Sequence, residues 1–320
     1  MSKVPVVTAI IVTYFPDYKF VGNLQMARDQ CDFVVVVDNT PKDYGFWNTR
    51  LAQSVIISND EPINQLTDEY KIFIFKNKAN LGLSVSYNKA VNVSRNLGTD
   101  YVVFLDQDSE LTGNAVVELL RQYLRLSKLF NVGGIGCTNI DVGMKNDNRR
   151  KSSNFSIRFH NYYEDEDVVE VLVKENSGFM IRMDKLLELG DFDESFFLDG
   201  VDYELCMRMR THGLNLFRAK KSVIWQSAGK VLPIRFLGKE IRITTRNPDR
   251  TYFIFREYIR LLLTYWNRSF LFMTKMLLDL GLLSIKIIVI YGDKKLHFAN
   301  ALKGLRDGLL KGKVRLQVNP

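Results

Sequence analysis

The chain of 320 residues is 46% hydrophobic and 25% charged, which is typical of a folded globular protein. It is long enough for one large α/β domain with an appendage, or for two domains. Its three cysteines, Cys31, Cys137 and Cys206, lie far apart and match no metal-binding spacing, so nothing indicates a disulfide scaffold. The N-terminus shows no signal-peptide pattern, and we therefore expect a cytoplasmic protein.

The net charge of +8 is distributed unevenly along the chain. Residues 230–320 contain 18 Lys and Arg against 6 Asp and Glu, a balance of +12, which leaves −4 for residues 1–229. A mildly acidic body with a basic, apolar tail is not the pattern of a nucleic-acid-binding protein. It indicates a domain whose tail meets an anionic surface, and a bilayer is the first candidate.

Short apolar runs alternate with amphipathic segments through the first two thirds of the chain. The runs predict strands at 6–12, 33–37, 72–75, 101–105, 132–138, 168–173 and 222–225. Helices are predicted at 20–30, 83–95 and 112–130, and another helix is predicted to start near Asp202. This alternation predicts an α/β fold with a mostly parallel sheet of βαβ units.

Polar residues follow three of the predicted strands. They are Thr13 and Tyr14, Asp38 and Asn39, and Asp106 and Asp108. The C-terminal ends of parallel strands line one edge of a sheet, so we expect these three sets to share a crevice. No glycine-rich phosphate loop follows the first strand, which disfavours the dinucleotide-binding and P-loop classes.

The chain is organised around Asp106-Gln107-Asp108, which ends the strand predicted at 101–105. Two aspartates separated by one residue can share Mg²⁺ or Mn²⁺, whose remaining positions take diphosphate oxygens. A turn that caps a helix explains the isolated motif equally simply. The motifs predicted around the same crevice favour the metal–diphosphate site.

A second acidic cluster contains Asp199, Asp202 and Glu204, after the aromatic pair Phe196-Phe197. Helical spacing puts Asp202 on the first turn of a helix, near its positive end. The cluster could hold a general base, and capping of the helix N-terminus is the alternative. The polar stretch 143–167 indicates a solvated surface loop, with a flap near the crevice as the alternative.

In combination, these motifs resemble glycosyltransferase family 2 enzymes of the GT-A fold, in the bacterial rhamnosyltransferase branch. The order and spacing of six motifs carry the resemblance over about residues 5–230: Ile11-Val12-Thr13-Tyr14, Val37-Asp38-Asn39-Thr40, Asn80-Leu81-Gly82 with Asn88, Leu105-Asp106-Gln107-Asp108-Ser109, Ser177-Gly178, and Phe197 to Arg208. The resemblance implies a Rossmann-like, mostly parallel catalytic domain at 1–230. A helical, basic, amphipathic region at 231–320 would follow it.

The resemblance also implies roles for individual residues. Thr13, Tyr14, Asp38, Asn80 and Gln107 would surround the donor nucleotide. Asp106 would contact the ribose or the metal, Asp108 would bind a divalent ion (Mg²⁺ or Mn²⁺), and Asp202 would deprotonate the acceptor hydroxyl. Contacts to the acceptor or a diphosphate are expected from Ser177, Gly178, Asp199, Glu204, Trp225, Gln226, Arg250 and Arg256. Relatives often have a metal-binding His where this chain has Gln226, so either water completes the metal shell or metal binding is weak.

The implied activity is inverting transfer of a deoxyhexose, L-rhamnose from dTDP-L-rhamnose, to a lipid-linked glycan. Such a step would belong to bacterial surface polysaccharide synthesis, of O-antigen or capsule. A UDP- or GDP-linked donor is the alternative within the family. A nucleotidyltransferase is disfavoured because Thr13-Tyr14-Phe15-Pro16 is not a basic glycine-rich loop, and Gln226 is the one feature that supports a non-catalytic scaffold.

The tail is mostly apolar between Glu257 and Tyr291, with charges near one line of a helical wheel. A transmembrane span is disfavoured because those charges would cross the hydrocarbon core. Two interpretations remain: a helix lying in the inner leaflet of the cell membrane, or a cap packed on the catalytic domain or on a second subunit. The membrane is favoured by a run of basic residues with one acid, Asp307, among them: Lys294, Lys295, Lys303, Arg306, Lys311, Lys313 and Arg315.

Overall fold

The computed structural model of the chain describes residues 4–41, 45–48, 54–57, 70–141, 162–227, 231–236 and 239–310. Most of the polar stretch predicted as a surface loop, at 142–161, lies outside the described residues. So do the last basic residues of the tail, Lys311, Lys313 and Arg315.

A mixed, mostly parallel sheet forms the centre of the structure, with the strand order β3-β4-β2-β1-β5-β9-β7-β10-β6 and with β8 paired to β10. Its strands are β1 (Val7–Thr13), β2 (Phe33–Asp38), β3 (Ser54–Ile57), β4 (Ile72–Lys76), β5 (Tyr101–Asp106), β6 (Glu110–Leu111), β7 (Val132–Asp141), β8 (Val168–Glu170), β9 (Phe179–Arg182) and β10 (Asn215–Gln226). The adjacent strands β3, β4, β2, β1 and β5 are all parallel, and β9 is inserted antiparallel between β5 and β7.

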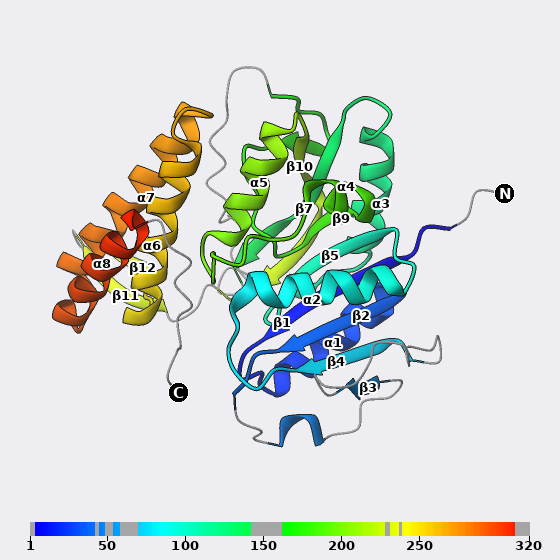
Figure 1. Cartoon of the computed structure of the whole chain (residues 1–320), viewed down its shortest axis with the longest axis horizontal. Helices are drawn as coiled ribbons and strands as arrows, with labels where there is room; N and C mark the ends of the chain where they lie inside the picture. The colour runs from blue at the N-terminus through cyan, green and yellow to red at the C-terminus, as the bar shows by residue number, and fades with distance from the viewer. Residues whose placement is uncertain are drawn as a thin grey trace.

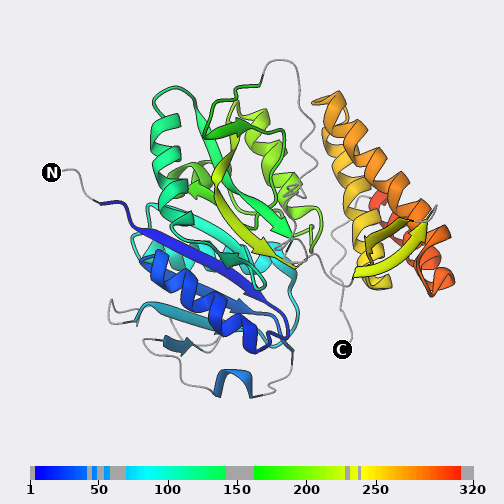
Figure 2. The same cartoon turned by 180° about the vertical axis from the view of Figure 1, so that it is seen from behind.

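The central strands are continuous apolar runs because helices cover both faces of the sheet. One face, toward the viewer in Figure 1, carries α2 (Gly82–Asn96), α4 (Met183–Leu189) and α5 (Val201–Thr211). The opposite face, seen in Figure 2, carries α1 (Tyr18–Gln30) and α3 (Ala115–Leu126). The predicted α/β class and the mostly parallel sheet are therefore confirmed.

The sequence prediction differs from the structure in several elements. It missed β3, β6 and β9, and it placed only the end of the 12-residue strand β10. The helix predicted at 112–130 is shorter, because Thr112 bonds to β10 through the Val223 carbonyl and α3 begins at Ala115. Strand β9 is only four residues long and precedes a helix directly, so its pattern did not separate it from its surroundings.

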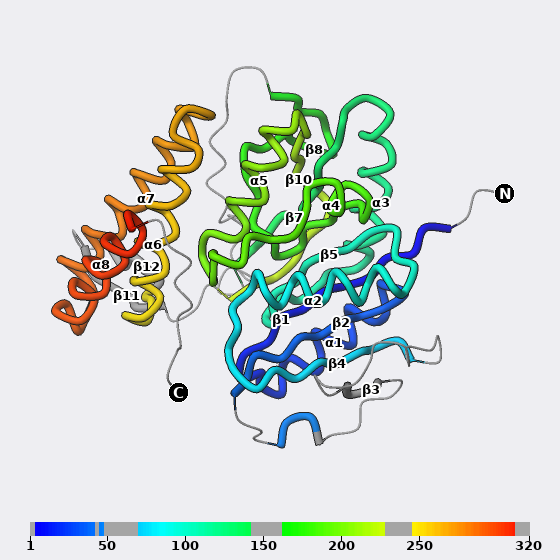
Figure 3. The backbone as a smooth tube through the Cα atoms, viewed as in Figure 1, coloured from blue at the N-terminus to red at the C-terminus, as the bar shows by residue number. Residues whose placement is uncertain are grey.

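The C-terminal part begins with the antiparallel pair β11 (Val231–Phe236) and β12 (Lys239–Thr244). Three helices follow, α6 (Pro248–Tyr265), α7 (Phe270–Val289) and α8 (Lys294–Leu309), and they form a layer at one end of the sheet (Figures 1 and 3). Buried residues of α6 and α7 share one hydrophobic cluster with α5, so this layer packs on the α/β body. Among the described residues, no helix has both the length and the apolar character needed to cross a bilayer.

Candidate active site

The strand register brings three predicted site segments to one edge of the sheet. Thr13 at the end of β1 is paired with Asp38 at the end of β2. On the other side of β1, Val12 is paired with Asp106 at the end of β5. The carboxyl ends of these parallel strands therefore form a common edge, where open α/β sheets usually bind ligands.

Asp38 is 1% exposed and is fixed by its own loop. Its carboxylate accepts hydrogen bonds from the Thr13 hydroxyl (3.0 Å), the Thr40 hydroxyl (2.6 Å) and backbone N–H (3.1 Å), and the Trp47 indole N–H (2.6 Å). The contact to a nucleotide that the resemblance implied for Asp38 and Thr13 stays a prediction, because these bonds show only what the two residues contact within the protein. Asp38 holds the loop that borders the site.

Tyr14 follows β1 and keeps its ring half exposed. Its backbone N–H donates to Gln107 Oε1 (2.8 Å), and Gln107 Nε2 donates to the Tyr14 carbonyl (3.4 Å). Asn23 Nδ2 on α1 donates to the Gln107 carbonyl (3.0 Å). Gln107 thus connects the turn after β5 to the turn after β1 and leaves the Tyr14 ring available to a base.

Asn80 has a local role, because its Oδ1 accepts the N–H of Gly82 at the start of α2 (3.1 Å). Gly82 has φ +81°, and a Cβ there would lie 2.6 Å from the Phe197 ring. The Leu83 N–H donates to the Phe197 carbonyl (2.7 Å). The Asn80 loop therefore packs against the turn that precedes α5, and Gly82 is required by both its backbone angle and this close contact.

Asp106 and Asp108 form the acidic centre of the edge. Gln226 Nε2, at the end of β10, donates to Asp106 Oδ2 at 2.5 Å, and the Asp106 N–H donates to the Ser109 hydroxyl at 3.1 Å. Burial, Asp108 and Glu175 raise the pKa of Asp106 to about 6. Burial also raises the pKa of Asp108, against hydrogen bonds from its own backbone, Ser227 and Gln226. The positive charge near these two carboxylates does not offset the cost of burying their charged forms.

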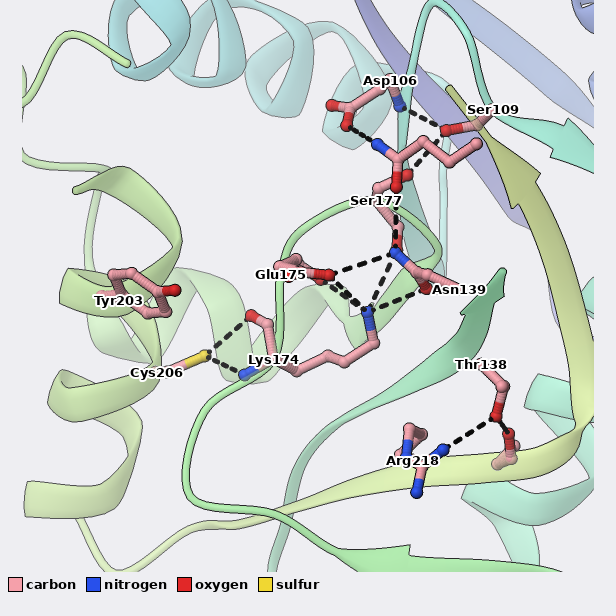
Figure 4. Close-up of polar contacts among 12 residues, drawn as sticks. Asp106, Ser109, Thr138, Asn139, Lys174, Glu175, Ser177, Tyr203, Cys206 and Arg218 are labelled. Carbon is pink, nitrogen blue, oxygen red and sulfur yellow. Dashed lines mark hydrogen bonds and ion pairs between the residues drawn. The ribbon is translucent and has the colours of Figure 1, made fainter. Parts of the chain in front are cut away.

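A polar network that the sequence analysis missed supports Asp106 from below (Figure 4). The buried Lys174 ammonium donates to Asn139 Oδ1 (3.2 Å) and to the carbonyls of Glu175 (3.2 Å) and Ser177 (3.3 Å). Asn139 Nδ2 donates to Gln226 Oε1 (3.2 Å), while the Ser177 hydroxyl contacts that of Ser109 (2.6 Å). Asn139 lies near the end of β7, so the rule that pointed to Asp106 could have found it.

Asp202 lies on the first turn of α5, as predicted. Burial, Asp106 and Glu175 raise its pKa to about 8, while a hydrogen bond from the Asn176 backbone and the charge of Lys174 oppose the rise. Cys206 of α5 also donates to the Lys174 carbonyl, so α5 borders the polar network that supports Asp106. A carboxyl group with a pKa near the working pH is suited to general acid–base chemistry.

Asp199 and Arg250 form a pair at the edge of this site. Arg250 donates through Nε (3.0 Å) and Nη2 (2.8 Å) to Asp199 Oδ1, and Arg246 Nη1 lies 3.4 Å from the same oxygen. Arg250 also lowers the pKa values of Asp106 and Asp108, so its charge reaches the acidic centre. The hydrogen bonds to Asp199 hold the Arg250 side chain in this position.

Two predicted contacts are corrected by the structure. Arg256 is 3% exposed and donates to Glu257 (2.8 Å) and to the Ser195 carbonyl (3.2 Å), so it cannot also reach a diphosphate. Glu204 accepts from Arg208 (2.9 Å) and the Tyr265 hydroxyl (3.1 Å), which ties α5 to α6. Arg256 thus ties α6 to the turn before α5, and Glu204 ties α5 to α6.

Glu257 is a further residue whose role the sequence analysis did not predict. It is buried completely and accepts the N–H groups of Phe197 (2.7 Å) and Gly200 (2.7 Å). Burial raises its pKa, although Arg256 opposes the rise. The helix α6 therefore fixes the turn that carries Asp199 and leads into Asp202.

Gly178 and Trp225 occupy supporting positions. Gly178 has φ +73°, and its N–H donates to the Phe104 carbonyl of β5 (2.8 Å). A Cβ at this position would lie 2.8 Å from Cys137 Cβ. Trp225 precedes Gln226 on β10, so the alternation of a strand directs its side chain to the other face from Asp106.

A divalent ion is compatible with this donor set. Among the described residues, no three His, Cys, Asp or Glu side chains are grouped as a complete metal site. Mg²⁺ and Mn²⁺ commonly bind one or two carboxylates, substrate phosphates and water, and Asp106 and Asp108 provide the two carboxylates. Their raised pKa values show that added positive charge would be favourable.

Comparison with known proteins finds a family whose model matches part of the chain. Residues 47–190 match the model of glycosyl transferase family 2. The chain is also 24% identical over 208 residues to the dTDP-rhamnosyl transferase RfbF of Shigella flexneri. That match spans 64% of this chain and 64% of the relative. The two findings support glycosyltransferase family 2, and the rhamnosyl branch less strongly.

The fold is GT-A. A crystal structure of GalNAc-T7 with UDP, GalNAc and Mn²⁺ superposes with a TM-score of 0.56 at 12% identity, over 97% of this chain and 57% of that one. Residues 1–349 of TarS from S. aureus in complex with UDP give 0.55 at 13% identity, over 95% of this chain and 81% of that one. At such identities these likenesses concern the fold.

Proposed function

We propose that the chain is a metal-dependent inverting glycosyltransferase. The observation that carries this proposal is a chain of hydrogen bonds that joins α5, which carries Asp202, to Asp106. It runs from Cys206 of α5 to Lys174, and from there through Asn139 and Gln226 to Asp106. A nucleotide-sugar donor would lie along the ends of β1 and β5, with its base near the exposed Tyr14 ring. This arrangement supplies both requirements of glycosyl transfer, a site for the diphosphate leaving group and a proton acceptor.

In the proposed reaction, the acceptor oxygen forms a bond to the anomeric carbon while the bond from that carbon to the diphosphate breaks. Asp202 accepts the hydroxyl proton, and its raised pKa makes it a stronger base than an ordinary carboxylate. Asp108 and Asp106 would hold a divalent ion that neutralises the departing diphosphate. Gln226 and Arg250 orient and partly compensate these carboxylates.

For the donor we propose dTDP-L-rhamnose, and for the acceptor a lipid-linked glycan of a bacterial surface polysaccharide. The name of the Shigella flexneri relative supports the donor. A UDP-linked sugar is the second candidate, because UDP is bound in the TarS structure. The division into a catalytic domain at 1–230 and a C-terminal region at 231–320 is part of the same proposal.

The test is transfer from a panel of dTDP-, UDP- and GDP-sugars with Mn²⁺ or Mg²⁺, comparing the wild type with Asp202→Asn. We expect turnover with dTDP-L-rhamnose that the variant lacks. The exposed Asp191→Asn provides a matched control that removes one acid near α5 without entering the site. Equal turnover in wild type and Asp202→Asn would refute the role of Asp202, and release of pyrophosphate from a sugar phosphate and a nucleoside triphosphate would indicate a nucleotidyltransferase instead.

We further propose that the helical layer lies on the inner face of the cell membrane. One side of α7 packs on the body, and its other side exposes large apolar side chains. The exposed apolar residues of the layer include Trp266, Phe270, Leu278, Ile285, Ile288, Val289, Phe298 and Leu302. Exposed Lys294, Lys295 and Lys303 on α8 add the positive charge that attracts anionic lipid.

Cosedimentation with vesicles tests this location. Wild type should bind vesicles containing anionic phospholipid, and the double variant Ile285→Ser with Ile288→Ser should bind them several-fold more weakly, because it removes exposed apolar area. Val117→Ser on α3 removes another exposed apolar side chain and should have no effect. Unchanged vesicle binding in the double variant would contradict the proposal. If sedimentation shows that the double variant has a smaller oligomeric mass than the wild type, the apolar surface would instead be assigned to contact with a second subunit.

A further inference from the structure

A cavity of about 270 Å³ lies between the α/β body and the helices α6 and α7. The body contributes residues from Val171 to Glu175 and Tyr203 of α5, while Tyr258 comes from α6. This volume is slightly smaller than that of ordinary ligand pockets. It suits one group of a larger molecule better than a whole substrate.

The lining of this cavity is strongly cationic. Five of its side chains are positively charged: Lys174, Arg218, Arg246, Lys275 and Lys286. Two are negatively charged, Glu175 and Asp279, which leaves a balance of +3. Three of the tail charges predicted to lie near one line of a helical wheel, Lys275, Asp279 and Lys286, therefore line this cavity.

The cations differ in how far they are already neutralised. Lys174 donates to three oxygens, and Lys275 is paired with Asp279 at 2.6 Å and contacts the Tyr203 hydroxyl at 3.3 Å. Arg246 makes one contact of 3.4 Å to Asp199, and within the described part of the chain Lys286 has no ion-pair partner. Burial and the neighbouring Arg246 lower the pKa of Lys286, which indicates uncompensated positive charge in the cavity.

The cavity also adjoins both the proposed base and the proposed membrane face. Tyr203 directly follows Asp202, and Lys174 and Glu175 both line the cavity and influence the pKa of Asp202. On the other side, α7 lines the cavity with Lys286, while its residues Ile285 and Ile288 are exposed. An anionic group in the cavity would therefore lie between an apolar surface and the base.

We propose that this cavity, the α6–α7 anion pocket, binds the diphosphate that joins the acceptor's glycan to its lipid. Lys286, Lys275 and Arg246 would contact the phosphate oxygens, and the first sugar would extend toward Asp202. This inference rests on the proposed function for the identity of the acceptor. Binding of a diphosphate to the pocket does not depend on sugar transfer.

The primary test is calorimetric binding of inorganic pyrophosphate to the full chain in EDTA, which prevents metal-mediated binding at Asp106 and Asp108. Lys286→Ala should weaken binding on the order of tenfold, because a charge-assisted contact is lost. Lys286→Arg keeps the charge and should retain most of the affinity. Lys128→Ala, just after α3 on the opposite face of the sheet, removes an exposed lysine away from the cavity and should leave affinity unchanged.

A second arm identifies the source of the diphosphate. Vesicles of neutral phospholipid containing a polyprenyl diphosphate should bind wild type more tightly than vesicles containing the matching polyprenol, and Lys286→Ala should abolish the difference. Equal binding to both vesicles would overturn the assignment to a lipid diphosphate. Equal pyrophosphate affinity in wild type and Lys286→Ala would overturn the pocket itself.

The transfer assay separates this inference from the proposed function. If transfer occurs, Lys286→Ala should raise the acceptor KM about tenfold and leave the donor KM unchanged. If no nucleotide sugar is used but pyrophosphate binding still depends on Lys286, the anion pocket stands and the proposed function fails. If transfer occurs with an acceptor KM that is the same in Lys286→Ala, the proposed function stands and the pocket is not its acceptor site.

Discussion

Asp38 ends β2 and Asp106 ends β5, so the two carboxylates occupy equivalent positions on either side of β1. Asp38 accepts four hydrogen bonds from three neighbouring residues and is sealed from solvent. Asp106 accepts one short hydrogen bond from Gln226, and its pKa is raised to about 6 by burial and by two nearby acids. One position stabilises a loop, while the other keeps uncompensated negative charge.

The difference shows that the role of an aspartate at the end of a strand depends on the hydrogen-bond donors around it. Neighbouring residues bring hydroxyl and indole donors to Asp38, so both of its carboxylate oxygens accept hydrogen bonds. The turn after β5 brings Asp108 toward Asp106, and Asp106 in turn raises the pKa of Asp202 on α5. The reactivity that we propose for this edge would follow from carboxylates that the protein leaves partly unpaired.

The largest effect that tests this comparison is expected from Asp202→Asn. The variant should lower kcat on the order of 10²- to 10⁴-fold, because it removes the proposed proton acceptor. Its unfolding midpoint should not fall, since the neutral amide removes a charge that burial and Asp106 disfavour. A variant with wild-type kcat, or one that fails to fold, would contradict the assignment of Asp202 to the reactive region.

The next effect concerns stability at the two strand ends. Asp38→Asn should lower the free energy of unfolding by about 1–3 kcal/mol, because donors that now share a carboxylate would lose an acceptor. The matched variant Asp106→Asn should not be destabilised at pH 8, since it removes a disfavoured charge. Denaturant unfolding of both variants measures the difference, and a larger loss for Asp106→Asn would reverse our interpretation of the edge.

A smaller effect is expected in the pH dependence of stability. Asp106 and Asp202 have folded-state pKa values of about 6 and about 8, above those of exposed aspartates. Between about pH 4 and 8 the folded chain therefore retains protons that the unfolded chain has released, and these groups lower stability as the pH rises. Asp202→Asn should stabilise more at pH 8.5 than at pH 5, measured as the unfolding midpoint in EDTA. An equal shift at both pH values would refute the raised pKa.

The sequence predicted which residues lie at the carboxyl edge of the sheet better than it predicted the hydrogen-bond partners of those residues. Apolar strands with polar ends are local patterns, so Asp106, Asp108 and the helical position of Asp202 could be predicted. The partners of Asp38 and Glu257 come from distant segments, and no local pattern reports that Glu257 accepts the N–H groups of residues about 60 positions earlier. Similarly, the helical wheel drawn for the tail from Glu257 to Tyr291 covers two helices, because Glu257 lies on α6 and Lys286 on α7.

The smallest effect is expected at Gln226, which stands where relatives often have a metal-binding His. Gln226→His should change the preference between metals, because imidazole binds Mn²⁺ in preference to the harder Mg²⁺. The ratio of half-activating Mg²⁺ to Mn²⁺ concentrations should rise about tenfold, within the range by which neighbouring groups tune metal affinity. Gln226→Ala is the control, since it also removes the hydrogen bond to Asp106 but adds no ligand. If both variants give the same ratio, position 226 does not reach the ion, and Asp106 with Asp108 would bind it without help from β10.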